Sequence, residues 1–197
     1  MAVRPIVIHG EPVLHRRAAE VESIDESIRE LLVDMEETLE ASNGVGLAAP
    51  QIGVGLRIFT WKYSGDTGAV PNRGVIINPR LRLIGRVSQE LPDPEQEVEG
   101  CLSAPGYSFP LKRSDHIEIT GLNADGEPVQ FEARGWFARI MQHEYDHLDG
   151  YLYVNRLADR YAKRWKKIVK REGWNEPGHS WLPGVDPDPF GHEDDAD

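Results

Sequence analysis

The residues with the clearest chemical potential are His143 and His147, which flank Glu144 in the pattern His-Glu-x-x-His. On a helix this spacing places both imidazoles on one face, about one turn apart, where they can bind the same metal ion. The pattern is expected by chance only roughly 0.02 times in a chain of this composition. Burying these groups without a metal would leave several donors and acceptors without partners. The pattern therefore indicates a metal site, with Glu144 beside the ligands.

A catalytic metal site needs a third protein ligand and an open position for water. A third histidine in the pattern HExxHxxGxxH is excluded, because Gly150 fits but position 153 is a tyrosine. Two candidates remain, namely Glu172 at the end of a basic helical stretch and Cys101 in the segment EGCLS. A lone cysteine is more often a small buried hydrophobic residue. The need for a third ligand favours Cys101 over Glu172.

The segment GVGLAAPQ, residues 44–51, is rich in small side chains. Small residues allow a ligand to approach the backbone closely, and Gln51 ends the segment with an amide that can donate a hydrogen bond. The Gly-x-Gly pair alone is weak evidence for a dinucleotide loop, because no strand is predicted before it. A tight loop packed under a sheet remains the alternative interpretation.

Three helices are predicted from apolar spacing. The first runs from Ile24 to Leu39, with Ser23 and Glu26 as a capping box, and ends at Asn43-Gly44. The second, from about Trp136 to Leu148, is apolar on most sides and is therefore expected to be buried. The third, from about Leu157 to Arg171, has one apolar stripe and an otherwise basic surface.

The strand signals favour antiparallel pairing. Asp125-Gly126 separates an alternating run at Ile117, Ile119 and Leu122 from a second run at Val129 to Phe131, which is typical of a hairpin. Further strands are predicted at 56–61, at 75–77 and through Leu81, Leu83 and Val87. We therefore predict an α+β fold in which antiparallel sheets pack around a central buried helix carrying HExxH, with an N-terminal helix and a C-terminal amphipathic basic helix.

The charge distribution divides the chain of 197 residues. In total, 22 Lys and Arg stand against 33 Asp and Glu, a net charge of −11, which disfavours a general nucleic-acid binder. Residues 156–172 are basic and residues 173–197 are acidic and rich in Pro and Gly, so we expect one catalytic domain over 1–172 followed by a tail without chemistry.

One cysteine cannot form an internal disulfide, and no apolar run reaches the ~18 residues of a membrane span, so a cytoplasmic protein is expected.

The three segments GVGLAAPQ, EGCLS and QHEYDH, in this order and at these separations, closely resemble the signature motifs of the peptide deformylases. The resemblance covers about residues 3–160, and the stretch from Pro5 to Leu14 is similar to the opening strand and turn of that family. The basic helix is similar to the C-terminal helix of bacterial members, whereas residues 173–197 extend beyond the shared core. The resemblance implies a metal-dependent hydrolase that removes the N-formyl group from the formylmethionine of newly made polypeptides and releases formate.

The same resemblance implies roles for the motif residues. Cys101, His143 and His147 would bind one divalent metal, with water in the fourth position. Glu144 would take a proton from that water and return it to the departing amine. The Gln51 amide and the Leu102 backbone N–H would stabilise the negative charge on the formyl oxygen. The family suggests Fe²⁺ in the cell, with Zn²⁺, Ni²⁺ or Co²⁺ able to replace it.

The resemblance also implies a peptide groove. The backbone around Gly44 to Gly46 and around Gly106 and Tyr107 is expected to pair with the substrate as an added strand. The pocket for the methionine side chain is expected to be lined by Val45, Trp136, Ile140 and His143.

Two positions depart from the family pattern. No arginine follows EGCLS until Arg113, although some members place one there to hold the peptide. Arg139 occupies a position that is commonly apolar, so its side chain either points away from the pocket or narrows it.

Two competing functions can be stated. A zinc endopeptidase would share HExxH but use Glu172 as its third ligand. A non-enzymatic module would hold a structural metal, which normally has four protein ligands, and bind RNA or a ribosome through the basic helix 156–172. Contact with the ribosome through this helix is also compatible with the deformylase prediction, whereas membrane and DNA partners are not expected.

Overall fold

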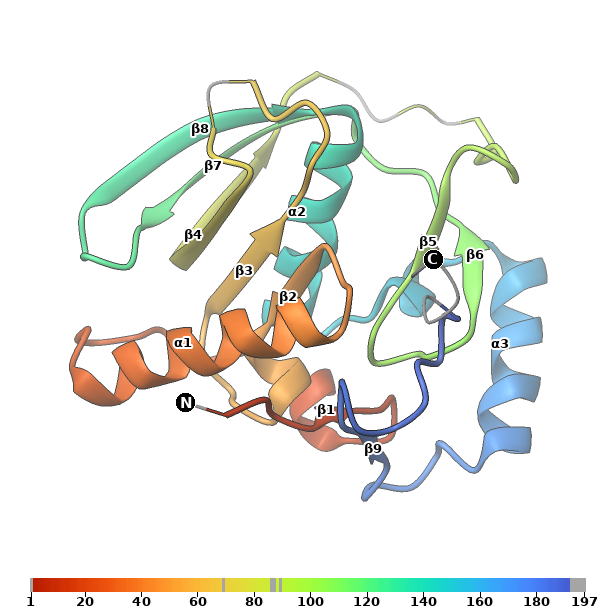
Figure 1. Ribbon diagram of the computed structural model, residues 1–197. Helices are drawn as coiled ribbons and strands as arrows, with labels where there is room; N and C mark the ends of the chain where they lie inside the picture. The colour runs from red at the N-terminus through yellow and green to blue at the C-terminus, as the bar shows by residue number, and fades with distance from the viewer. Residues whose placement is uncertain (1, 69, 86–87, 89, 192–197) are drawn as a thin grey trace, which may run out of the picture.

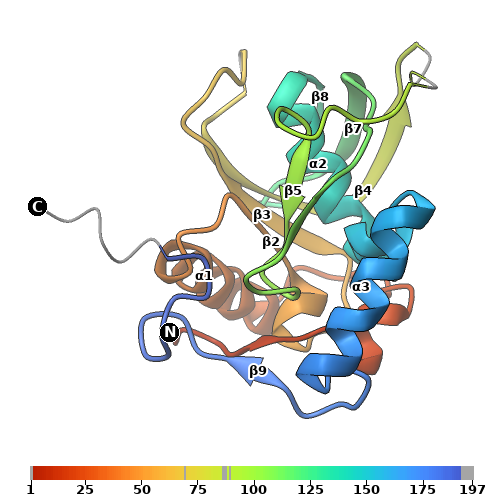
Figure 2. The ribbon, with the colours of Figure 1, turned by 90° about the vertical axis from the view of Figure 1, so that its right-hand side faces the viewer.

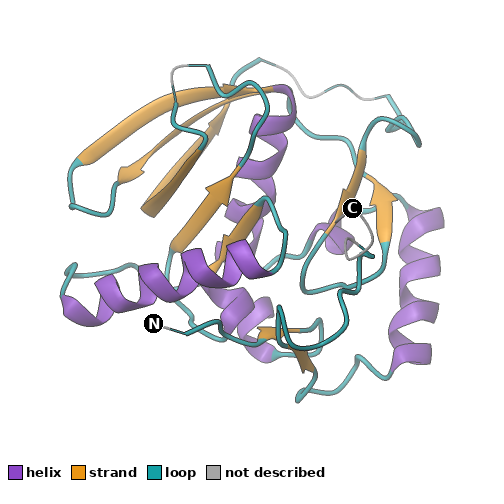
Figure 3. Cartoon of the chain, in the orientation of Figure 1, coloured by secondary structure: helices purple, strands orange, loops and turns teal. Residues whose placement is uncertain are grey.

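The computed structural model describes residues 2–68, 70–85, 88 and 90–191. Within these residues, the sheets are antiparallel and contain no βαβ units, and Figures 1 and 3 show how helices and strands are arranged. The elements in chain order are β1 Ile6–Val7, η1 Pro12–His15, α1 Glu26–Ala41, β2 Gly46–Ala48, η2 Ala49–Ile52, β3 Ile58–Lys62, β4 Arg73–Leu83, β5 Val98–Gly100, β6 Ser108–Pro110, β7 His116–Leu122, β8 Pro128–Arg134, α2 Gly135–Leu148, η3 Tyr153–Arg156, α3 Asp159–Glu172 and β9 Ser180–Trp181.

The main sheet has five strands in the order β2-β3-β4-β7-β8, and every neighbouring pair is antiparallel. The α+β class and the antiparallel pairing are therefore confirmed. The predicted hairpin is β7–β8, whose turn places Gly126 at a φ of 82°, a conformation that favours glycine. Two predicted strands are in fact one, β4, which bends where Asn78 adopts a φ of 51° and the register shifts. Val87 lies outside the described residues.

The start of α1 differs from the prediction. The helix begins at Glu26, and the N-cap is Asp25, whose carboxylate accepts a hydrogen bond from the Ile28 N–H at 3.1 Å. The capping box built on Ser23 and Glu26 is therefore wrong. Asp25 is placed better, because its oxygen reaches the third free N–H of the first turn. The C-cap is Ser42, close to the predicted stop at Asn43-Gly44.

Helix α2 packs against strands of the main sheet and carries the two histidines of the HExxH pattern. Its apolar face belongs to a core with Phe59, Ile76, Ile117 and Ile119. Most of its side chains are buried, but Trp136 in the first turn is half-exposed. The helix ends at Leu148, followed by Gly150 at a φ of 80°, as the sequence pattern indicated.

Two segments from opposite halves of the chain lie side by side near its N-terminus. Strand β9 pairs with β1, and the segment after α3 returns beneath the body of the molecule (Figure 2). Helix α3 begins at Asp159, three residues later than the predicted start of the basic helix at 156, because Tyr153–Arg156 form a separate 3₁₀ turn. Figure 1 shows α3 on the opposite side of the molecule from the β7–β8 hairpin. Trp165, Ile168 and Val169 form its buried stripe.

Across the described part of the chain, no helix combines the length and the apolar character needed to cross a membrane.

Candidate metal-dependent active site

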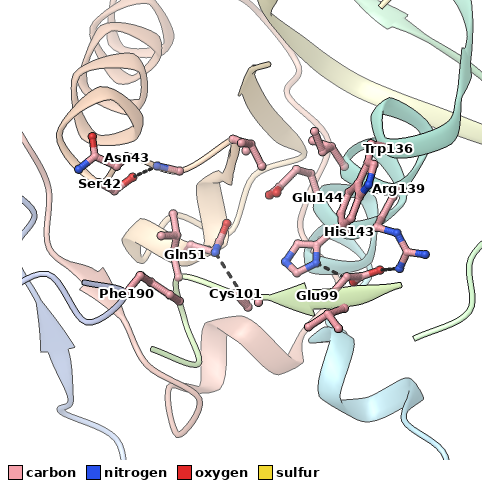
Figure 4. A pocket seen from close by; sticks show the side chains of 17 residues that line it. Ser42, Asn43, Gln51, Glu99, Cys101, Trp136, Arg139, His143, Glu144 and Phe190 are labelled. Carbon is pink, nitrogen blue, oxygen red and sulfur yellow. Dashed lines mark hydrogen bonds and ion pairs between the residues drawn. The ribbon is translucent and has the colours of Figure 1, made fainter. Parts of the chain in front are cut away.

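A cavity of about 220 Å³ opens where the 42–46 segment, β5 and α2 come together (Figure 4). These elements belong to three distant parts of the chain. Eleven of the residues singled out from the sequence line it: Gly44, Val45, Gly46, Gln51, Cys101, Leu102, Trp136, Arg139, Ile140, His143 and Glu144. The remaining lining residues are Ser42, Asn43, Val98, Glu99, Gly100 and Phe190.

Cys101, His143 and His147 lie together, and the first two of them line the cavity. Their ligand atoms all lie within 4.8 Å of one another, and all three residues are buried. The Cys101 Sγ is 3.4 Å from the His147 Nε2, and the two imidazole centroids are 5.0 Å apart. Among the described residues, these three side chains form the one group of His, Cys, Asp or Glu whose atoms are close enough to hold a metal ion together.

The chemistry of these donors fits a divalent transition metal. A thiolate with two imidazoles suits zinc, iron, cobalt or nickel. Burial holds the pKa of His147 well below its usual value, so its ring is neutral and can offer a nitrogen lone pair. The Glu99 carboxylate lies 3.1 Å from the Nδ1 of His143, which leaves the Nε2 of His143 for the metal.

Glu99 is the centre of a buried charge network. Arg113 donates to both of its oxygens, at 2.9 and 3.0 Å, and Arg139 donates to it at 2.7 Å. Burial would raise the pKa of Glu99, but the hydrogen bond with His143 and the charge of Arg113 hold it well below its usual range. The carboxylate is therefore ionised and fixes the orientation of the His143 ring.

Asp146 extends this network on the far side of Arg113. Its carboxylate accepts from Arg113 at 2.6 Å and from Arg156 through two hydrogen bonds of 2.6 Å each. Because Asp146 and His143 are on the same helix, the network ties α2 to the segment that carries Arg113. Arg139 lines the cavity, with its guanidinium held by Glu99 and by the Leu111 carbonyl oxygen at 2.7 Å.

Glu144 is 3% exposed and points into the cavity from α2. Burial raises its pKa to about 7. Its Oε2 has no hydrogen-bond partner among the described residues, so this oxygen is available to a water or a ligand. A Cβ at Gly46 would lie 2.3 Å from the other oxygen, so position 46 has to be glycine for Glu144 to occupy this place.

Gln51 is held in one orientation by the backbone of its own segment. Its Oε1 accepts a hydrogen bond from the Ala48 N–H at 2.8 Å. The amide nitrogen therefore faces the cysteine segment, 3.7 Å from the Cys101 Sγ and 3.5 Å from the Ser103 Oγ. This arrangement presents an N–H donor beside the cluster of ligand atoms (Figure 4).

Two of the predicted substrate contacts lie elsewhere. Gly106 and Tyr107 do not line the cavity. Tyr107 instead packs edge-on against Trp165 and Trp174, and Glu172 accepts a hydrogen bond of 2.6 Å from its hydroxyl group. That contact also places Glu172 outside the group of Cys101, His143 and His147.

Sequence reasoning missed three functional features of this site: the support of His143 by Glu99, the pairing of Glu99 with Arg113, and the presence of Phe190 in the cavity wall. Glu99 lies two residues before Cys101 in the EGCLS segment, but the short strand β5 that carries it was not predicted. Arg113 and Phe190 reach the site only through tertiary folding, and no local pattern marks them.

Comparisons with known proteins agree with this geometry. The sequence profile of the polypeptide deformylase family matches residues 3–163. The peptide deformylase of Mycolicibacterium smegmatis is 50% identical over 198 residues, covering 98% of this chain and all of that protein. Peptide deformylase 2 of Corynebacterium efficiens is 50% identical over 194 residues with the same coverage.

Solved structures give the same result. A peptide deformylase from Ehrlichia chaffeensis superimposes with a TM-score of 0.73 at 34% identity, covering 87% of this chain and 97% of that one. A second structure from this organism, in complex with actinonin, has a TM-score of 0.73 at 36% identity and covers 87% and 99% of the two chains. This chain therefore belongs to the peptide deformylase family, metalloenzymes that remove the N-formyl group from newly made polypeptides.

Proposed function

We propose that deformylation takes place in the cavity between the 42–46 segment, β5 and α2, on the N-terminal formylmethionine of a peptide. The observation that carries this proposal is the convergence of Cys101, His143 and His147 next to the buried Glu144. Three protein ligands leave one position of a tetrahedral metal free, as a catalytic site requires.

The proposed ligands are the Cys101 thiolate and the two imidazoles, and the proposed ion in the cell is Fe²⁺, with Zn²⁺, Ni²⁺ or Co²⁺ as substitutes. When bound, a divalent ion would act as a Lewis acid and lower the pKa of water toward neutrality. Iron next to a thiolate would make the site sensitive to oxygen, which favours purification without air.

Glu144 is the proposed general base and acid. Its carboxylate is buried at the cavity wall with one oxygen free, so it can accept a proton from the attacking water and pass it to the departing amine. Gly46 supports this role, because it leaves room for the carboxylate against β2. The proton would travel only a short way, because the water, the Glu144 carboxylate and the departing amine would share one small cavity.

Gln51 and the Leu102 backbone N–H are the proposed donors to the oxygen of the formyl group as negative charge develops on it. The fixed Gln51 amide supports this assignment, because a donor that is already oriented costs no reorganisation during the reaction. Loss of one such donor typically lowers turnover about 10² to 10³-fold.

The proposed peptide groove runs along Gly44, Val45 and Gly46, with the methionine side chain toward Trp136 and Ile140. The lining of the cavity by these residues supports the proposal. Peptide contacts by Gly106 and Tyr107 stay a prediction for a longer substrate, because neither residue lines the cavity. Contact with the ribosome through the exposed basic face of α3 is a further proposal.

Formate release tests the proposed reaction. Protein purified without oxygen and loaded with Fe²⁺ or Ni²⁺ should release formate from a formyl-Met-Ala-Ser peptide, and Glu144→Gln should reduce the rate at least about 10²-fold while keeping its metal. Glu36→Gln, an exposed acid on α1, is the matched control and should keep the parental rate. Folded, metal-loaded parent protein that releases no formate would contradict the proposal.

A further inference from the structure

The segment that follows α3 is anchored on the loop of residues 101–107 between β5 and β6, here called the catalytic loop. Trp174 and Trp181 are both buried, and β9 pairs with β1. The Trp181 Nε1 donates a hydrogen bond of 2.9 Å to the carbonyl oxygen of Leu102, the residue that follows Cys101. The acidic segment, for which the sequence predicted no chemistry, is therefore attached directly to the loop that carries the proposed thiolate ligand.

From this anchor the chain continues to the cavity. Phe190 is one of the residues that line it. The Phe190 ring lies over β5, because a Cβ built at Gly100 would be 3.7 Å from its Cε1. The preceding residue lies over the other end of the catalytic loop, since the Pro189 carbonyl oxygen would be 3.4 Å from a Cβ at Gly106.

Phe190 and Trp136 lie on different sides of the cavity. Figure 4 shows Trp136 beyond Glu144 and His143, and Phe190 on the side of Gln51 and Cys101. The proposed methionine pocket is on the Trp136 side. The Phe190 ring lies against β5 on the side away from Trp136, so a peptide whose methionine side chain points toward Trp136 and Ile140 and whose chain extends away from them would pass this ring.

We propose that Phe190 is a specificity-determining residue that contacts the side chains following formylmethionine and favours apolar ones. This inference rests on the proposed function of the cavity. Apart from Val45, the 42–46 segment and Gly100 have small or polar side chains, so the aromatic ring adds an apolar surface beside them. Burial of a substrate side chain against this ring removes apolar area from water, which improves binding of that substrate over a polar one.

The test compares peptides that differ only after methionine. The substrates are formyl-Met-Leu-Leu-amide, formyl-Met-Ser-Ser-amide and formyl-methionine amide, assayed with full-length, metal-loaded protein. In Phe190→Ala, the ratio of kcat/KM for the Leu-Leu peptide to that for formyl-methionine amide should fall about threefold to tenfold, as expected for a lost apolar contact. In Val185→Ala, which changes a residue of the same segment that is 74% exposed, this ratio should keep its parental value.

A second readout separates contact from stability. Calorimetric affinity for the product Met-Leu-Leu-amide should fall in Phe190→Ala, whereas Phe190→Leu, which keeps an apolar side chain, should retain most of the preference. Equal losses for all three substrates, or an unchanged ratio in a folded Phe190→Ala protein, would overturn this inference alone. A parent protein that releases formate from none of the three substrates would instead refute the proposed function.

Discussion

At the scale of single residues, the site depends on groups outside the predicted set of metal ligands. Glu99 orients His143 and is itself held by Arg113 and Arg139. Its carboxylate therefore balances two buried guanidinium groups as well as the imidazole. Removing one partner from such a network leaves buried charge uncompensated, which typically costs about 3–5 kcal/mol.

Glu99→Gln should weaken metal binding. An amide cannot accept from His143 and both arginines as a carboxylate does, so His143 loses its fixed orientation and metal affinity should fall about 10 to 100-fold. Titration with a competing chelator measures this affinity. The control is Glu97→Gln, which removes a neighbouring carboxylate that pairs with Lys112 at 3.0 Å and with Arg139 at 3.6 Å but not with His143. Equal metal affinities in the two variants would contradict the role given to Glu99.

At the scale of elements, β2 can pack closely against α2 because Gly46 has no side chain. Gly46→Ala should displace the Glu144 carboxylate, because the added Cβ would lie 2.3 Å from it. Misplacing a catalytic group by about 1 Å can cost about 10²-fold in rate. Turnover of a formyl-Met peptide measures the loss. Gly55→Ala, whose Cβ would meet only Val13 at 3.8 Å, should keep the parental rate. Parental turnover in Gly46→Ala would contradict this packing argument.

Helix α3 offers a second test at this scale. Its apolar stripe packs inward and leaves Lys163, Arg164, Lys167 and Lys170 exposed. Reversing these four charges to glutamate should abolish ribosome binding, measured by co-sedimentation at low salt, because exposed basic groups bind RNA phosphates electrostatically. The control reverses four exposed arginines elsewhere: Arg17, Arg80, Arg82 and Arg134. Ribosome binding that survives the α3 reversal would contradict the proposal.

The elements show where sequence patterns suffice. The apolar spacing of α1, α2 and α3 and the Asp-Gly turn of β7–β8 are local, and each was predicted to within a few residues. Strands β5 and β6 were not predicted, because three-residue strands carry too little alternation to be recognised. The cap of α1 was misplaced for a related reason: Ser23 and Asp25 are both good caps, and only the chain path selects between them.

At the scale of the whole molecule, the site joins segments that are far apart in sequence. Motif resemblance predicted Cys101, His143 and His147 as metal ligands and pointed to Glu144 and Gln51, and the structure brings these residues together. Phe190 is 89 positions beyond Cys101 and reaches it only because β9 pairs with β1 and Trp181 binds the Leu102 carbonyl. The position of Phe190 depends on these tertiary contacts, which a single sequence does not reveal.

The packing of the two ends also predicts a pH dependence of stability. Burial, with the nearby His15 contributing, lowers the pKa of His9 from 6.5 to about 4; Lys166 and Lys170 line the same pocket. The unfolded chain therefore binds a proton at His9 between pH 6.5 and 4 while the folded chain does not, so the free energy of unfolding must fall as the pH falls through this range.

Urea unfolding of parent protein and His9→Gln at pH 8, 6 and 5 measures this effect. The parent should lose more stability than the variant between pH 8 and 5, because only the parent carries His9 with its lowered pKa. Other titrating groups, including the metal ligands, contribute to both proteins and cancel in the difference. Identical pH profiles would show that His9 is protonated equally in the folded and unfolded chains.

The most direct measurement of the central claim determines metal content and formate release on the same samples of parent, Cys101→Ser and Glu172→Gln. If Cys101, His143 and His147 hold the metal at which a formyl peptide is hydrolysed, Cys101→Ser should lose both bound metal and formate release. Glu172→Gln should keep both, because Glu172 lies outside this group. A Cys101→Ser protein that keeps its metal and its activity, with loss of both in Glu172→Gln, would contradict the account.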